Sequence, residues 1–336
     1  LAPHGKTHMS PQLLQMQFDA GAIAVTAATI SQVRVFRAFG VRRVILANEF
    51  VDSAGLRWLT QELNDDADFQ LTCWVDSVAG VAIMDRELTG LLRPLDVCVE
   101  VGASGARTGC RTATESDAVA HAVTASRHLR LVGVAGYEAA LGQDVSPPAR
   151  QVIGEYLSTL RQTTLRLAPL IEADEILVTA GGSTHFDLVA AALTGWPAGM
   201  AVRTVLRSGC YLTHDDGLYQ RTSPLTRADD AQLRPALSVW AQVTSTPEPG
   251  LALLAMGRRD VGFDAGLPVS RTLPGAAMTQ LNDQHAFLTV PSDYVVRVGD
   301  WLEFGVSHPC TTLDRWQAIP VLDADRRVID VVRLFF

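Results

Sequence analysis

The sequence predicts an α/β protein with two parts: a parallel (β/α)8 barrel over residues 1–218 and a mainly antiparallel β domain over residues 219–336. Short apolar segments alternate with longer amphipathic ones up to about residue 215, a pattern typical of parallel strands joined by crossover helices. There are eight such apolar segments, the number that a closed barrel needs. From about Tyr219 the helical spacing gives way to short β-like runs separated by turn residues, which indicates the antiparallel domain.

The expected elements follow from these two periodicities. The barrel strands are predicted at residues 2–6, 22–27, 43–47, 70–75, 95–101, 130–135, 175–179 and 200–206. The barrel helices are predicted at residues 31–38, 54–63, 78–88, 115–127, 148–170 and 186–192. The strands of the second domain are predicted at residues 237–244, 251–256, 287–290, 301–304, 316–322 and 328–334. An open doubly wound sheet is the alternative for the first part, but the strand count favours closure.

Composition restricts the classes of function. A chain of 336 residues that is 48% hydrophobic can bury a large core. Its net charge of -8 argues against a nucleic-acid partner. We expect no membrane partner, because no apolar run reaches about eighteen residues, and no signal peptide, because nothing at the start of the sequence looks like one. The five cysteines lack CxxC spacing, which predicts reduced thiols and a cytoplasmic protein; they are Cys73, Cys98, Cys110, Cys210 and Cys310.

In a barrel of this kind, functional groups lie at the carboxyl ends of the strands. Lys6 ends the first expected strand, between His4 and His8. A lysine becomes nucleophilic where burial or nearby cations lower its pKa, and its usual use is a Schiff base with a carbonyl compound. The alternative is an exposed lysine in a loop.

Glycine-rich segments follow the expected seventh and eighth strands. Turns of this kind can expose backbone N–H groups that bind a phosphate group, although many such turns are only turns. Together with a lysine on the first strand, they predict a site for pyridoxal phosphate, with its aldehyde toward the amine. The candidate phosphate-binding residues are Gly181, Gly182, Ser183, Gly209 and Cys210.

The second domain contains a candidate metal pair. His308 and Cys310 are two positions apart, so on an extended backbone they would lie on one side and present an imidazole and a thiolate to one ion. Zinc is the ion that this pair favours. An H-x-C pattern can also arise by chance.

Motifs along nearly the whole chain point to one family. They are PHGKTH at the start, VGASGARTG at 101–109, TAGGS at 179–183, RSGCY at 207–211, MGRRDVGFDAGLP at 256–268, DQH at 283–285 and VSHPCTTLDRW at 306–316. These motifs resemble the D-serine dehydratase and D-threonine aldolase family, fold-type III enzymes that carry pyridoxal phosphate on an alanine-racemase-like barrel. The pattern is most similar to bacterial amino-acid deaminases of the D-serine dehydratase kind, because the aldolase branch typically has H-x-D in place of H-x-C.

The resemblance implies roles for the residues of the barrel. Lys6 would form the Schiff base with the cofactor and then remove the α-proton of a D-amino acid. Arg107 would hydrogen-bond the phenolic oxygen of the cofactor, and Tyr137 would lie beside its ring or reach its phosphate. The phosphate would be surrounded by the glycine-rich segments, with Cys210 at a place where relatives often have Asn or Ser.

The resemblance also implies roles for the second domain. His308 and Cys310 would hold Zn2+ or another divalent cation, which would bind the β-hydroxyl of the substrate and assist its departure. Relatives carry a further stretch before the lysine strand, so we expect either that a preceding segment is missing or that the β domain is completed differently. On resemblance alone we expect a homodimer.

The implied reaction is the β-elimination of D-serine, or of a related D-3-hydroxy amino acid, to a 2-oxo acid and ammonia. The runner-up is a metal-dependent D-threonine aldolase, which would release glycine and an aldehyde. An amino-acid racemase and a non-catalytic pyridoxal phosphate carrier are less favoured alternatives. A racemase needs a second acid on the opposite face of the cofactor ring. A pyridoxal phosphate carrier consists of a single barrel, so the β domain expected here argues against that alternative.

Overall fold

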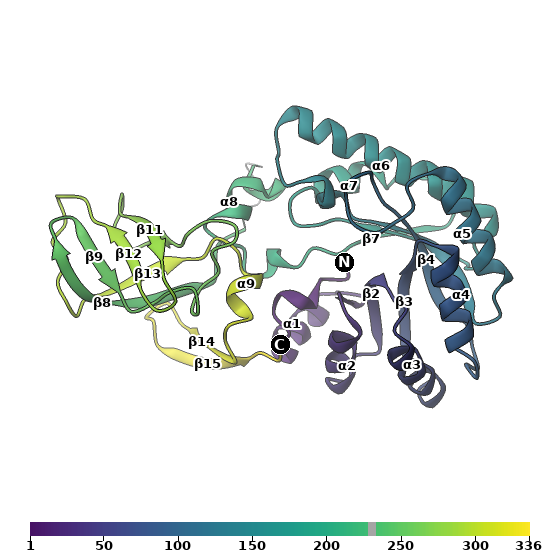
Figure 1. Ribbon diagram of the computed structural model, residues 1–336, viewed down its shortest axis with the longest axis horizontal. Helices are drawn as coiled ribbons and strands as arrows, with labels where there is room; N and C mark the ends of the chain where they lie inside the picture. The colour runs from purple at the N-terminus through teal and green to yellow at the C-terminus, as the bar shows by residue number, and fades with distance from the viewer. Residues whose placement is uncertain (228–232) are drawn as a thin grey trace. The chain divides into compact units, whose positions relative to one another are not determined.

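The computed structural model describes residues 1–227 and 233–336, and the chain divides into two compact units (Figure 1). Unit 1 comprises Leu1–Lys6 and Leu14–Ser208. Unit 2 comprises Thr7–Leu13 and Gly209–Phe336. Unit 1 therefore ends at Ser208, and the short N-terminal segment Thr7–Leu13 belongs to unit 2. The domain boundary at residue 218 stays a prediction.

Unit 1 contains a seven-stranded sheet in which all neighbouring strands are parallel and follow chain order. Its strands are β1 (Val25–Ala27), β2 (Arg43–Glu49), β3 (Gln70–Val75), β4 (Leu95–Val101), β5 (Leu129–Gly136), β6 (Ile176–Ala180) and β7 (Val202–Leu206). The crossover helices are α2 (Ile30–Ala38), α3 (Ser53–Asp65), α4 (Val78–Glu87), α5 (Ala113–Ala125), α6 (Pro147–Leu167) and α7 (Phe186–Ala192). Figure 1 shows these helices on the outside of the curled sheet.

The first residues of the chain lie between the two edge strands of this sheet. Ala2 N donates to Leu206 O at 2.9 Å, next to β7, and Thr26 N, in β1, donates to Pro3 O at 2.8 Å. Residues 1–4 thereby occupy the position of an eighth strand. The predicted α/β architecture, a parallel barrel followed by an antiparallel β domain, is confirmed.

The predicted strand at residues 2–6 ends earlier than expected, because Gly5–Thr7 form the short 3-10 helix η1. The turn needs a glycine at position 5: an added Cβ would lie 2.5 Å from Phe36 Cζ and 2.7 Å from Val25 Cγ2. The chain therefore leaves the sheet one residue before Lys6. As a result the Lys6 side chain is exposed at the end of the strand position.

Four of the crossover helices begin with a capping side chain directly after a strand or loop. The hydroxyl or carboxylate oxygens of these residues accept hydrogen bonds from backbone N–H groups of the first turn, which satisfies donors that the helix leaves unpaired. The caps of α2, α3, α4 and α5 are Thr29, Asp52, Ser77 and Thr112. In α5, Thr112 and Glu115 form a complete capping box. These caps explain why the predicted helices begin where they do.

Unit 2 is built around a closed antiparallel barrel with the strand order β10-β11-β12-β9-β8-β13. Its strands are β8 (Ser238–Glu248), β9 (Leu251–Leu254), β10 (Val269–Ser270), β11 (Ala277–Leu281), β12 (Ala286–Thr289) and β13 (Trp301–Gly305). A separate hairpin consists of β14 (Ala318–Leu322) and β15 (Val328–Arg333). The sequence did not predict β10 and β11, because β10 has two residues and β11 buries only Met278 and Leu281.

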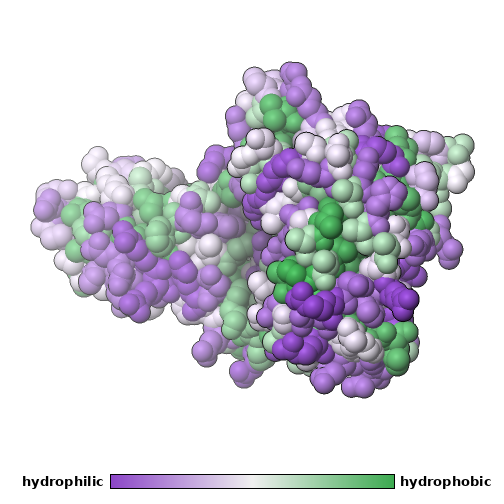
Figure 2. Space-filling view, turned by 45° about the vertical axis from the view of Figure 1, so that its right-hand side comes forward, coloured by the Kyte–Doolittle hydropathy of each residue, from purple (hydrophilic) through white to green (hydrophobic). Residues whose placement is uncertain are grey.

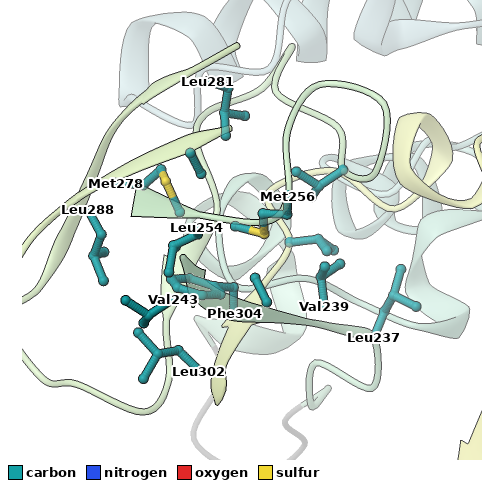
Figure 3. Close-up of a cluster of buried hydrophobic side chains, with 14 of the residues drawn as sticks. Leu237, Val239, Val243, Leu254, Met256, Met278, Leu281, Leu288, Leu302 and Phe304 are labelled. Atoms are coloured by element: carbon teal, nitrogen blue, oxygen red, sulfur yellow. The ribbon is translucent and has the colours of Figure 1, made fainter. Parts of the chain in front are cut away.

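The barrel of unit 2 encloses its own hydrophobic core (Figure 3). Burial alternates along β8, where Val239, Ala241 and Val243 are buried and their neighbours are not, as expected for a strand with one face on a core. Leu254 and Phe304 are fully buried in the same cluster. Complete burial of one such side chain stabilises the fold by roughly 1.5–3 kcal/mol.

On the face shown in Figure 2, hydrophilic side chains are interspersed with hydrophobic ones. Single exposed apolar residues such as Leu92, which is 82% exposed, are normal on protein surfaces. Within residues 1–227 and 233–336, no helix has the length and apolar character needed to cross a membrane.

Candidate active site

Lys6 is one of three cationic residues that act on His4. Burial lowers the pKa of His4 well below its usual value, and the charges of Lys6, Arg207 and Arg107 lower it further. His4 Nδ1 is buried without a hydrogen-bond partner among the described residues. His4 is therefore neutral, and the charges of three cationic side chains act on it. Such surroundings favour an anionic ligand.

Lys6 is also the only lysine in the sequence; every other position in the Lys+Arg count is an arginine. The sequence prediction did not use this signal. An arginine cannot replace it in imine chemistry, because its guanidinium stays protonated. An amine-dependent reaction on a side chain of this protein can therefore use only Lys6.

Arg207 lies directly after β7 and is buried, with 6% exposure. Its guanidinium donates to Thr179 Oγ1 at 2.6 Å and to Gly136 O at 2.8 Å, and its Cζ lies 5.3 Å from the centre of the Trp74 ring. The charge of Glu138 acts on it favourably. This buried cation was not among the predicted site residues, although its place at the end of a strand was the available signal.

The structure brings together three of the predicted cofactor-binding residues. Arg107 Cζ lies 4.4 Å from the centre of the Tyr137 ring. An added Cβ at Gly182 would lie 3.1 Å from Tyr137 Cε2, so the backbone of Gly182 approaches the same ring. Arg107 and Tyr137 also line a small pocket together with Glu100. A planar ring with an oxygen substituent could bind beside this arginine and tyrosine.

The backbone amides of Gly181 and Gly182 have a partner in the structure. They donate to the carboxylate of Glu138, at 2.9 Å to Oε2 and 2.7 Å to Oε1, while Ser208 Oγ donates to Gly182 O at 3.0 Å. Ser183 follows them and is buried. The role of these three residues as phosphate ligands stays a prediction. Glu138 was missed by the sequence analysis, and its position next to Tyr137 was the only hint.

A pair of acidic residues, Glu49 and Glu100, lies at the ends of β2 and β4. Burial and, after it, the neighbouring carboxyl groups of Glu100 and Asp76 together raise the pKa of Glu49 to about 8. Both carboxyl oxygens of Glu49 and Glu100 Oε2 are buried without a hydrogen-bond partner among the described residues. Glu49 is therefore mostly protonated at neutral pH.

In unit 2, the predicted metal pair is joined by a third residue. One ligand atom each of Cys210, His308 and Cys310 lies within 4.8 Å of the others. The sulfur atoms of Cys210 and Cys310 are 3.3 Å apart. The prediction that Cys210 binds phosphate is untested, but Cys210 belongs to unit 2 and its sulfur contacts the metal pair.

The predicted extended backbone between His308 and Cys310 is wrong, although the two side chains do meet. Pro309 has helical torsion angles, φ -64 and ψ -42, and Cys310 begins the short helix α9 (Cys310–Leu313). The chain turns after β13 and brings both side chains to one place. The proline favours this turn, because its ring fixes φ near the helical value.

His308 is oriented by a carboxylate. Its Nδ1 lies 2.7 Å from Asp264 Oδ2, and Thr311 Oγ1 donates to Asp264 Oδ1 at 2.5 Å. Burial tends to lower the pKa of His308, but the Cys310 thiolate and Asp264 raise it to about 9. With Nδ1 bound to Asp264, Nε2 is the ring nitrogen available to an ion. This carboxylate–imidazole arrangement is common at metal sites.

The two thiols differ in charge state. The hydrogen bond from Cys210 is the largest of the effects that lower the pKa of Cys310 well below its usual value, and His308 adds to it. The same hydrogen bond raises the pKa of Cys210. Thr7 Oγ1 lies 3.4 Å from Cys310 Sγ. A thiolate, a second sulfur and an imidazole form a soft donor set that fits zinc.

Comparisons with known proteins agree with these observations. The family described as alanine racemase, N-terminal domain, matches residues 4–194, and the family described as putative serine dehydratase domain matches residues 236–322. Among the curated proteins, none matches the chain.

Several solved structures share the fold. D-threonine aldolase from Filomicrobium marinum is 22% identical with a TM-score of 0.84, over 99% of this chain and 86% of that one. D-threo-3-hydroxyaspartate dehydratase from Delftia sp. HT23 is 22% identical with a TM-score of 0.77, over 99% of this chain and 89% of that one. Mutants of a D-threo-3-hydroxyaspartate dehydratase also match: a histidine-to-alanine mutant and, two positions along, a cysteine-to-alanine mutant in a metal-free form.

The alanine racemase family match covers more than half of the sequence, and the serine dehydratase match covers most of the β barrel of unit 2. The two family matches follow each other along the chain in the same order as the barrel motifs and the motifs of the second domain. The chain therefore belongs to the alanine racemase N-terminal domain family. The predicted resemblance to the D-serine dehydratase and D-threonine aldolase family is confirmed by the match to the serine dehydratase domain and by the shared fold of the solved structures.

Proposed function

We propose that this protein is a D-serine dehydratase that depends on pyridoxal phosphate and a divalent metal, and converts D-serine or a related D-3-hydroxy amino acid to a 2-oxo acid and ammonia. The observation that carries the proposal is the cluster of His308 and Cys310 with Asp264 behind the imidazole. The mutated histidine and cysteine of the D-threo-3-hydroxyaspartate dehydratase have the same spacing, and its cysteine mutant is described in a metal-free form. Zn2+ is the metal that we propose.

The residues of unit 1 would hold the cofactor and move the α-proton. Lys6 is exposed and is the only lysine, so we assign to it both the attachment of the cofactor and the removal of the proton at Cα. Bound pyridoxal phosphate supplies an electron sink that makes this proton acidic. Arg107 and Tyr137 would hold the ring. Ser183 would hold the phosphate, next to Gly181 and Gly182, whose amides donate to Glu138. The three cationic side chains that act on His4 support an anionic group here.

The residues of unit 2 would act on the leaving group. His308 and Cys310 would hold the metal, which supplies a Lewis acid for the departing β-hydroxyl. Asp264 fixes the imidazole ring and leaves Nε2 to face the ion. Without such help hydroxide is a poor leaving group, and this is why the proposed reaction needs the metal.

A D-threonine aldolase is the second candidate, and one observation favours it. The F. marinum aldolase has a TM-score of 0.84, against 0.77 for the Delftia dehydratase, at the same 22% identity. An aldolase would use the same basic groups to cleave the Cα–Cβ bond. The products distinguish the two reactions, because the aldolase releases glycine and an aldehyde.

A product assay tests the proposal. Purified protein loaded with pyridoxal phosphate and Zn2+ is incubated with D-serine, D-threo-3-hydroxyaspartate, D-threonine or D-alanine, and 2-oxo acid, glycine and L-alanine are measured. We expect 2-oxo acid and ammonia from a D-3-hydroxy amino acid, and loss of this activity with EDTA that Zn2+ restores. Glycine from D-threonine without 2-oxo acid would establish the aldolase, and L-alanine from D-alanine a racemase. EDTA-resistant formation of 2-oxo acid would contradict the role of the metal.

A further inference from the structure

We infer that Cys210 is a third protein ligand of the metal, so that the site consists of two thiolates and one imidazole. This inference rests on the proposed function and deepens it. The sequence predicted only the H-x-C pair and placed Cys210 at the phosphate. The structure instead places the Cys210 sulfur within 4.8 Å of ligand atoms of both His308 and Cys310.

The distance between the two sulfurs distinguishes an ion site from a disulfide. Cys210 Sγ and Cys310 Sγ are 3.3 Å apart, whereas the S–S bond of a disulfide is about 2.05 Å. Two thiolates on a tetrahedral zinc, each about 2.3 Å from the metal, are about 3.8 Å apart. The observed separation is closer to the second arrangement. A movement of about half an ångström would therefore suffice to complete the site.

The position of Cys210 is fixed by its local structure. It begins the 3-10 helix η4 (Cys210–Leu212), and His214 N donates to its carbonyl oxygen at 2.8 Å. The residue is 5% exposed, so the sulfur is directed into the protein. Burial removes a thiol from bulk solvent, and the polar partners of Cys210 there are the sulfur of Cys310 and the side chain of Tyr219.

The surroundings of the three residues carry excess negative charge. Asp264 lies behind His308, and Asp215 acts electrostatically on both Cys210 and His308. Asp215 is fully buried, and its Oδ2 has no hydrogen-bond partner among the described residues. Two sulfurs and two carboxylates lie around one imidazole, and such a set of donor groups is suited to a divalent cation.

Three protein ligands have consequences for the chemistry. A tetrahedral zinc with two thiolates and one imidazole keeps one position for water or for a substrate oxygen. The second thiolate also makes the site softer, which favours Zn2+ over Mg2+ and Mn2+. The site can therefore retain its metal while the remaining position exchanges oxygen ligands.

X-ray absorption at the zinc edge, on wild-type protein loaded with one Zn2+, counts the sulfurs without any substitution. We expect two sulfur neighbours at about 2.3 Å. A single sulfur neighbour would overturn the inference and leave the proposed function intact. Failure of the wild-type protein to bind zinc would overturn both.

Substitution gives a second, independent measurement. With Co2+ in the site, the near-ultraviolet charge-transfer absorbance per bound ion reports the number of thiolates. In Cys210→Ser we expect this absorbance to fall by about half, and the dissociation constant for Zn2+ to rise at least about tenfold. Cys73→Ala is the matched control, since Cys73 is a buried cysteine on β3, and it should change neither quantity. An unchanged cobalt spectrum and zinc affinity in Cys210→Ser would exclude Cys210 as a ligand.

Discussion

The candidate sites of the two units have opposite electrostatic character. In unit 1, Lys6, Arg107 and Arg207 all act on a neutral His4. In unit 2, two sulfurs and two carboxylates surround a single histidine. The first arrangement favours an anion such as a phosphate group, and the second favours a metal cation. The two units of one chain thus present surroundings suited to ligands of opposite charge.

The largest effect is expected from removing the metal site while leaving unit 1 unchanged. Cys310→Ala should lower the rate of 2-oxo acid formation from D-serine by about 10³-fold or more, because the leaving group loses its Lewis acid. Binding of pyridoxal phosphate, followed by its absorbance, should persist in this variant. Cys73→Ala serves as the control and should keep both properties. Loss of cofactor binding together with metal binding would show that the two sites are not separable.

The carboxylate of Glu138 should matter to the stability of unit 1. In Glu138→Ala the buried amides of Gly181 and Gly182 lose their acceptor, which should lower the free energy of unfolding by about 2–5 kcal/mol. Denaturant titration measures this change. Glu155→Ala is the control, because Glu155 is exposed on α6 and its carboxylate accepts from the side chain of Gln151. Equal stability of the two variants would contradict the structural role of Glu138.

Asp264, which hydrogen-bonds the proposed ligand His308, should affect the affinity of unit 2 for zinc. Asp264→Asn weakens the hydrogen bond that orients His308, and we expect the dissociation constant for Zn2+ to rise by about 10–100-fold. Competition with a chelator measures it. Asp325→Asn, a change at a carboxylate that is 73% exposed, should have no effect. If both variants bind zinc as tightly as the wild type, Asp264 does not support the site.

The acidic pair of unit 1 should make stability fall as pH rises. The pKa of Glu49 is raised from 4.5 to about 8 in the folded protein, so between these values the folded state binds more protons than the unfolded one. Its stabilising effect is complete below pH 4.5 and is lost by about pH 8, with a slope of up to about 1.4 kcal/mol per pH unit. Glu49→Gln should reduce this slope, as measured by denaturant titration at pH 5, 6.5 and 8. An unchanged slope would mean that Glu49 is ionised in the folded state.

Local sequence patterns predicted the fold well where one residue period is sustained. The strand predicted at residues 70–75 and the helix predicted at residues 186–192 match the bounds of β3 and α7. β10 and β11 carry too few buried residues to give such a signal. The predicted first strand included Lys6, whereas the chain turns at Gly5. The side chain that leaves no room for a Cβ at position 5 is that of Phe36, which is distant in sequence, so no local pattern indicated the turn.

The candidate sites could be predicted only in part. The individual residues Lys6, His308 and Cys310 were found from motifs. The pairing of Cys210 with Cys310 joins positions 100 residues apart, and the bonds from Gly181 and Gly182 to Glu138 join positions 43 and 44 residues apart. Such contacts depend on the path of the whole chain. No local spacing rule predicts them, and Glu138 and Asp264 were therefore left without a role.

The central claim, that Lys6 carries pyridoxal phosphate, can be tested most directly by reductive trapping. Wild-type protein with pyridoxal phosphate is reduced with sodium borohydride, digested and mapped by mass spectrometry. We expect one phosphopyridoxyl group per chain, on the side chain of Lys6, the only lysine of the sequence. Absence of this adduct, or an adduct only on the α-amino group, would contradict the account.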